Sequence, residues 1–111
     1  MARTFDEIWK DIINELSNRN SVTTLVRRVR NDLISVAQDH IKVRSEMTRK
    51  IRKIPRSQFE QIWETMVDDG FFVSKTHKPY VHSQIICAIL SLLDYVRVSY
   101  SPLTIHLEQN P

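Results

Sequence analysis

A run of cations in the middle of the chain is the feature with the clearest chemistry. Residues 42–56 hold one acid, Glu46, and seven basic side chains: Lys42, Arg44, Arg49, Lys50, Arg52, Lys53 and Arg56. The whole chain carries a net charge of +3, so the remainder is slightly acidic. Such a concentration of positive charge attracts phosphate backbones and other anionic surfaces. The alternative is a solvated connector whose charges only keep the protein soluble.

Phosphate contacts supply much of the affinity of DNA-binding proteins and make it depend steeply on salt. They position a protein on the duplex without reading its sequence. The basic segment therefore predicts a surface that attracts phosphate backbones and binds them mainly by electrostatic attraction.

Residue counts exclude several classes of enzyme. The 111 residues contain one glycine, Gly70, and one cysteine, Cys87. Glycine-rich phosphate loops and the nucleophile elbow of hydrolases need at least two glycines. A single thiol forms no disulfide framework, and the four histidines lack the spacing of zinc ligands. Cys87 lies in an apolar stretch and is predicted to be a buried hydrophobe. We expect no catalytic residue, no metal and no cofactor, and hence a protein that is not an enzyme.

Length and composition favour one α+β domain spanning residues 1–111, because this size is typical of single domains. The longest apolar stretch, from Ile85 to Leu93, is shorter than the roughly 20 residues of a membrane span. No export signal is recognisable at the start of the sequence, and no small-molecule substrate is indicated. The expected location is the cytoplasm, without membrane contact.

Residues 1–45 are predicted to form a helix and a β-hairpin. Apolar side chains recur at helical spacing from Phe5 to Leu16, and Thr4 with Glu7 has the spacing of a capping box. Residues 34–36 and 41–43 alternate between apolar and polar side chains around a loop at 37–40, which is typical of a hairpin. Residues 23–29 are compatible with a further strand, while a helix over Leu25 to Ile34 fits the same spacing.

Residues 46–56 are predicted to be a basic connector, attached to the core by Ile51 and Ile54. A helix over residues 57–69 follows, with Ser57 and Glu60 as a second capping box. Gly70 is expected to end this helix in a left-handed conformation, with Phe71 making the apolar contact of the cap.

The C-terminal part is predicted to contain a short strand at 72–73, a polar loop at 74–79, a deeply buried helix over 82–93 and a hairpin over 95–107. This order of elements resembles a winged-helix domain over residues 57–107. The resemblance implies that helix 82–93 enters the DNA major groove, with Lys75, Lys78, His82, Ser83 and Gln84 at its entrance. It also implies a wing that offers Arg97, Ser99, Tyr100 and Thr104. The helix departs from the family pattern because it contains no Arg or Lys for base readout.

The residues 41–45, 54–59 and 62–63 also resemble accessory domains of bacterial restriction and anti-phage defence proteins. Together, these features predict a winged-helix-like fold of three main helices with an N-terminal hairpin and a C-terminal hairpin wing. The expected function is non-enzymatic DNA binding, in a regulator or a defence system. The alternative is a protein-interaction or homodimerisation module of a larger assembly, docking through Phe5, Trp9 and Ile13. Trp9 and Trp63 themselves are predicted to lie in the core.

Overall fold

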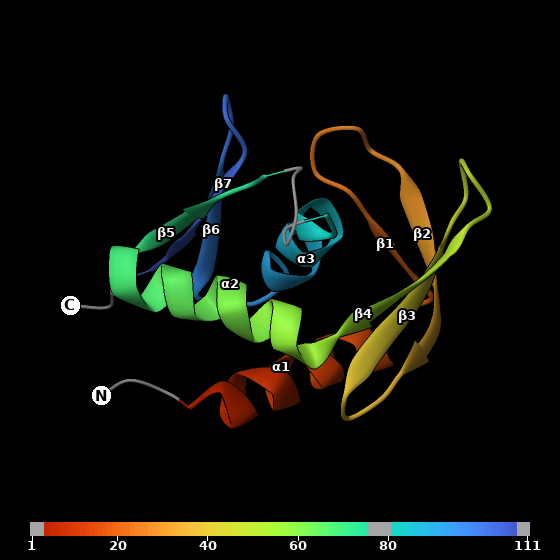
Figure 1. The fold of residues 1–111 in the computed structure, drawn as a ribbon, viewed down its shortest axis with the longest axis horizontal. Coiled ribbons are helices and arrows are strands. Elements are labelled where there is room, and N and C mark those ends of the chain that lie inside the picture. Colours follow the sequence, from red (N-terminus) through yellow and green to blue (C-terminus); the bar gives the residue numbers. More distant parts are fainter. Residues whose placement is uncertain (1–3, 76–80, 109–111) are drawn as a thin grey trace.

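The computed structural model describes residues 4–75 and 81–108. Within these residues the chain forms three helices and seven strands (Figure 1). In chain order these are α1 (Phe5–Ser17), β1 (Ser21–Thr23), β2 (Arg30–Val36), β3 (His40–Ser45), β4 (Ile51–Pro55), α2 (Arg56–Asp69), β5 (Phe71–Val73), α3 (Ser83–Leu90), β6 (Val96–Ser99) and β7 (Thr104–Leu107).

The strands form two antiparallel sheets on either side of α3. The first sheet has the order β1-β2-β3-β4 and the second has the order β5-β7-β6. Figure 1 shows α3 end-on between them, with α1 and α2 running along one side of the molecule. The two long helices touch through aromatic rings, because the centroids of Trp9 and Phe59 lie 5.3 Å apart at a steep angle.

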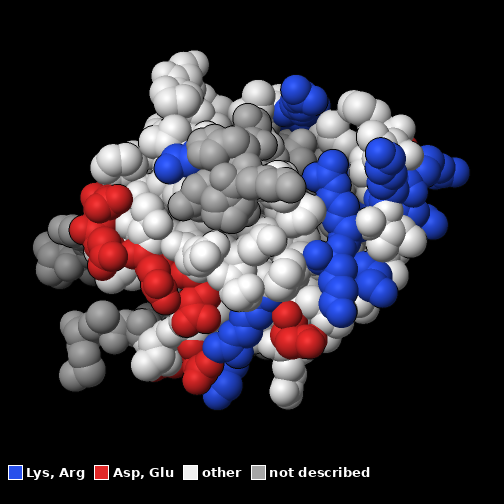
Figure 2. All heavy atoms as spheres, viewed as in Figure 1, with Lys and Arg blue, Asp and Glu red and all other residues white. Residues whose placement is uncertain are grey.

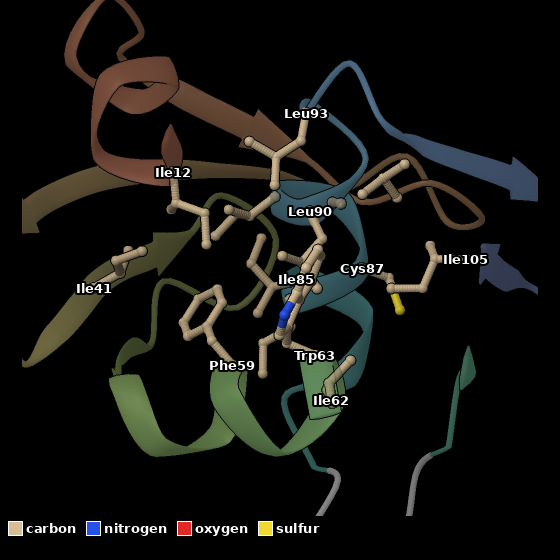
Figure 3. Close-up of a cluster of buried hydrophobic side chains, with 14 of the residues drawn as sticks. Ile12, Ile41, Phe59, Ile62, Trp63, Ile85, Cys87, Leu90, Leu93 and Ile105 are labelled. Atoms are coloured by element: carbon tan, nitrogen blue, oxygen red, sulfur yellow. The ribbon is translucent and has the colours of Figure 1, made fainter. Parts of the chain in front are cut away.

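The core is built around α3, and Figure 3 shows side chains from both sheets and both long helices converging on it. Every residue of α3 from Ile85 to Leu90 is buried, because the sequence there is apolar on nearly all sides of the helix. Ile41 of the first sheet and Ile105 of the second are both 0% exposed. One hydrophobic core therefore joins the two sheets.

The predicted winged-helix architecture is wrong. The N-terminal part contains a four-stranded sheet in place of a single hairpin, and the basic connector contains one of its strands, β4. β1 adds the other unpredicted strand, while residues 24–29 form turns and loop in place of the predicted strand or helix. The fold is α+β with two separate sheets.

Two further details of the basic segment differ from expectation. Ile54 is 0% exposed, as predicted, but Ile51 is 59% exposed and does not attach the segment to the core. α2 begins at Arg56 after Pro55, without a side-chain cap, so the predicted capping box at Ser57 is absent. Proline is well suited to this junction because its fixed φ is compatible with the approach to a helix.

Other local predictions are confirmed. The side chain of Thr4 caps α1 by accepting a hydrogen bond from the amide of Glu7 at 3.3 Å. The β2–β3 hairpin and the β6–β7 hairpin both form. Gly70 ends α2 with φ at +86°, and its amide donates to the carbonyl of Met66 at 2.7 Å. Phe71, predicted to make the apolar contact of the cap, is 44% exposed, whereas its neighbour Phe72 is buried.

We expect Gly70→Ala to lower the free energy of unfolding by about 1 kcal/mol, because a side chain disfavours the left-handed conformation. Apart from its chain neighbours, no atom of the described residues lies within 4 Å of the added Cβ, so the loss is conformational. Urea denaturation measures it. Gly70→Asn is the matched control and should lose less, because Asn tolerates positive φ. Equal stability of Gly70→Ala and the unchanged protein would contradict a requirement for glycine.

Candidate nucleic-acid interface

The first sheet has one buried face and one open face. Val22, Ile41, Val43 and Ile54 point to the core, where each is 5% exposed or less. Side chains alternate along a strand, so Lys42 and the β3 residues two positions before and after it point away from the core, to solvent. Antiparallel sheets commonly expose one face to water in this manner.

The register of β3 and β4 divides the basic segment between the two faces. Lys42 and Lys53 are directly opposite each other, and both lie on the open face. Arg52 is opposite the buried Val43, so it lies on the inner face, at the exposed end of β4. The seven predicted cations therefore do not form a single patch, because a strand turns successive residues to opposite sides.

Positive charge nevertheless gathers at one end of the molecule. In Figure 2 the Lys and Arg side chains cluster on the side of the first sheet, and the acidic side chains follow α2. The acids of α2 are Glu60, Glu64, Asp68 and Asp69. A polyanion approaching this protein is attracted by one end and repelled by the other.

The predicted cations of this end differ in whether a carboxylate neutralises them. Arg44 lies 3.7 Å from Asp32, which also binds Arg30 at 3.2 Å. The others make no ion pair with the described residues: Lys42, Arg49, Lys50, Arg52 and Lys53. These five residues, termed the uncompensated cations below, are the part of the predicted site that has charge available for a ligand.

Arg56 has a different environment from the other cations. Its guanidinium forms an ion pair with Asp6 and lies 5.2 Å from the ring centroid of Phe5 and 5.7 Å from that of Trp9. Planar guanidinium groups stack favourably on aromatic faces. Arg56 therefore connects the start of α2 to α1, and we do not include it in the interface.

Among the C-terminal cations, Arg97 lies away from the uncompensated cations. Arg97 is on β6, in the sheet on the other side of α3, and forms an ion pair with Glu108. That contact raises the pKa of the guanidinium. The amine of Lys75 lies 5.9 Å from the ring of Phe72. Lys78 lies outside the described residues.

The start of α3 is not shaped for insertion into a groove. The Ser83 hydroxyl is fully buried, accepts from the amide of Lys75 at 3.1 Å and donates to the carbonyl of the same residue. Gln84 donates from Nε2 to Ser74 Oγ at 3.1 Å. Because the remainder of α3 is enclosed between the sheets, its side chains do not reach base edges.

His82 precedes α3 and is partly buried. Its Nδ1 is inaccessible to water and has no hydrogen-bond partner among residues 4–75 and 81–108. Burial lowers the pKa of this imidazole, and the positive charge of Arg52 lowers it further. His82 is therefore held in its neutral form near neutral pH, and it contributes no charge to the predicted interface.

Sequence analysis missed three arginines, Arg27, Arg28 and Arg30, which precede or begin β2. The amide of Glu46 donates to the carbonyl of Arg30 at 2.9 Å, so this segment lies beside the turn between β3 and β4. Arg28 and Arg49 have φ values of +57° and +63° in these two neighbouring loops. Left-handed conformations are uncommon for residues other than glycine and concentrate at functional sites. In the sequence, the adjacent basic residues Arg27 and Arg28 were a signal that could have drawn attention to this segment.

The remaining candidate groups take part in packing. Cys87 is buried in α3, as predicted, and burial raises the pKa of its thiol to about 12. Across residues 4–75 and 81–108, no three His, Cys, Asp or Glu side chains gather as metal ligands. None of the helices described in these ranges combines the length and apolarity that a membrane crossing requires.

Both tryptophans lie in the core, as predicted: Trp9 is 3% exposed and Trp63 is 6% exposed. Trp9 was also the centre of the predicted docking stripe on α1. Its ring packs on Phe59 of this same chain, so that position of the stripe has no surface to offer a partner. Protein interaction stays an alternative prediction without an identified surface.

Comparison of this chain with protein-family models, curated proteins and solved structures finds no match. The resemblance to accessory domains of defence proteins therefore stays a prediction.

We expect Arg56→Ala to lower the free energy of unfolding by about 1 kcal/mol, through loss of the aromatic stack and of a partly exposed ion pair. Chemical denaturation measures this loss. Arg56→Lys is the matched control: it keeps the charge but loses the planar stack, so its stability should be intermediate. An Arg56→Ala protein as stable as the unchanged one would contradict this structural role.

We expect His82 to make the protein less stable in mild acid. An unfolded histidine has a pKa of about 6.5, and the folded value is lower. The unfolded chain therefore binds more protons, and stability falls as pH drops below about 6.5. Urea midpoints at several pH values between about 7.5 and 5 measure the slope. His82→Gln should have a shallower slope over that range, and an unchanged slope would contradict the burial of a neutral imidazole.

Proposed function

We propose that this protein binds double-stranded DNA by its phosphate backbone and is not an enzyme. The proposed surface is the β3–β4 hairpin with its turn, which carries all five uncompensated cations. The observation that supports it best is the cross-strand pair of Lys42 and Lys53. Like charges directly opposite each other destabilise a sheet, and a bound polyanion would offset that repulsion.

The geometry of the hairpin favours contact with phosphates over base readout. β4 is the edge strand of its sheet, with Arg52 on one face and Lys53 on the other. An edge strand with cations on both sides presents a ridge of positive charge. Phosphates on a duplex recur along both borders of a groove, so a ridge of this kind has acid groups within reach on either side.

The charge distribution of the whole protein supports one orientation on DNA. The acidic side chains of α2 lie away from the basic hairpin in Figure 2. The duplex would therefore contact the end of the molecule formed by the first sheet, with α2 directed away. A role in a bacterial regulator or defence system is compatible with this proposal and rests only on the resemblance of residues 41–45, 54–59 and 62–63.

Salt dependence of DNA affinity tests the proposal. If each of the five uncompensated cations neutralises one phosphate, log affinity should fall with log salt at a slope of about −4.5. Fluorescence anisotropy with a labelled duplex measures this slope. The double variant Lys42→Gln/Lys53→Gln should have a slope shallower by about 1.8, because two contacts are lost.

The matched control is Lys10→Gln/Arg97→Gln, which removes the same charge from α1 and the second sheet. Its slope should equal that of the unchanged protein. Absence of binding at about 50 mM salt would contradict the proposal. Equal effects of the two double variants would contradict the assignment of the β3–β4 hairpin and indicate attraction by net charge alone.

A further inference from the structure

We infer that Met47, in the turn between β3 and β4, inserts as an apolar wedge between two base pairs of the bound duplex and kinks it. The inference rests on the proposed DNA binding and adds the way in which the hairpin engages the duplex. Figure 1 shows this turn projecting beyond the strands of the first sheet. A duplex that approaches the basic end of the molecule therefore meets the turn.

Met47 is exposed at a place where a polar residue is usual. Its side chain is 67% exposed, the largest fraction among the large hydrophobic residues of the described chain. Turns are rich in Gly, Pro, Asn, Asp and Ser, and residues 46–50 contain none of these. Proteins depart from such local preferences mainly at functional sites. An exposed methionine in this turn therefore indicates a contact with a partner.

Hydrogen bonds hold the turn in one conformation. The amide of Arg49 donates to the carbonyl of Ser45 at 2.8 Å, and the amide of Ser45 donates to the carbonyl of Lys50 at 3.0 Å. The Ser45 hydroxyl accepts from the amide of Thr48 at 3.3 Å, and the Thr48 hydroxyl accepts from the amide of Lys50 at 3.3 Å. This network holds Arg49 at its positive φ. A backbone that is fixed before binding loses less entropy when Met47 is inserted.

Arginine side chains lie around Met47. Arg27 and Arg52 line the same hollow as Met47, and Arg49 follows it by two positions. None of the three arginines forms an ion pair with a residue in the ranges 4–75 and 81–108. Arginine commonly enters the minor groove of DNA, attracted by its negative potential. Phosphates border that groove on both sides, so these guanidinium groups can hold the backbone while Met47 reaches the base pairs.

The chemistry of methionine suits a wedge. Proteins that kink DNA from the minor groove insert Phe, Leu, Ile, Met or Pro side chains between base steps. The unbranched side chain of Met47 adapts to a narrow space, and its sulfur makes favourable contacts with aromatic rings. Kinking is easiest at flexible pyrimidine–purine steps such as TA. The inference therefore predicts preference for a flexible step, without hydrogen bonds to particular bases.

An anionic membrane would also attract an apolar side chain surrounded by cations. Proteins that lie on membranes insert a wide apolar face, commonly with Trp, Phe or Leu. The turn at residues 46–50 contains one apolar residue and no aromatic residue. One side chain is sufficient for one base step but buries too little surface to hold a protein on a membrane. DNA is therefore the partner that this turn favours.

The first measurement detects unstacking and bending at one base step. A duplex of about 30 base pairs carries a central TA step with 2-aminopurine in place of the adenine, and a second duplex carries dyes at its ends for energy transfer. We expect the protein to raise both the 2-aminopurine fluorescence and the energy transfer. It should bind the TA duplex about threefold more tightly than one in which a stiffer AA step replaces TA.

Substitutions at Met47 test whether this side chain is the wedge. Met47→Ala should lose both signals, and Met47→Leu should keep most of each because leucine also serves as a wedge. Both variants should keep the salt slope of the unchanged protein, since neither removes a phosphate contact. The matched control is Val67→Ala, which shortens an exposed apolar side chain on α2 and should change neither signal. Urea midpoints check that each variant is as stable as the unchanged protein.

The outcomes separate the wedge from the proposed function. Loss of both signals in Met47→Ala at an unchanged salt slope supports the wedge. Duplex binding without unstacking, or signals that survive in Met47→Ala, overturns the wedge and leaves the proposed function in place. Absence of duplex binding overturns both. Binding to vesicles of phosphatidylserine and phosphatidylcholine that Met47→Ala abolishes would then assign the turn to a lipid surface.

Discussion

Enclosure of α3 is the constraint on which the rest of the structure depends. A helix that is apolar on nearly all sides must be covered on all sides, and neither sheet alone is large enough to do so. The first sheet, the second sheet and the pair α1–α2 each cover part of it, as Figure 3 shows. This arrangement fixes which face of the first sheet is buried. It thereby fixes which of the cations on β3 and β4 reach solvent on the open side.

Local patterns in the sequence predicted the elements whose signals are local. The cap at Thr4, the stop at Gly70 and both hairpins were recognisable because few neighbouring residues determine each. β4 was missed because only Ile54 of its five residues is buried, so no alternating pattern is visible in the sequence. Val26 illustrates the opposite error: its stretch of apolar residues suggested a strand, yet the side chain is 53% exposed in a loop. In both segments tertiary packing, and not the local sequence pattern, determines whether a strand forms.

The same limit applies to the candidate site. The cations of residues 42–56 were identifiable from composition, but their division between two faces required knowledge that β4 is a strand in register with β3. The role of Arg56 depends on Asp6, fifty positions away in the sequence. A hollow of about 270 Å³ on the inner side of the first sheet is lined by Asn31, Arg52 and Gln84, which come from three distant segments. No spacing rule relates such residues, because the fold alone brings them together.

The position of β4 at the edge of its sheet gives the cations a second consequence. An edge strand has unpaired backbone groups that can pair with the edge of another molecule and start aggregation. Charged side chains on β4 oppose such pairing, and Pro55 at its end has no amide hydrogen to donate. The residues proposed to hold DNA therefore also keep neighbouring copies apart. Solubility and DNA affinity both depend on the charged side chains of this strand, so a substitution that changes one property also changes the other.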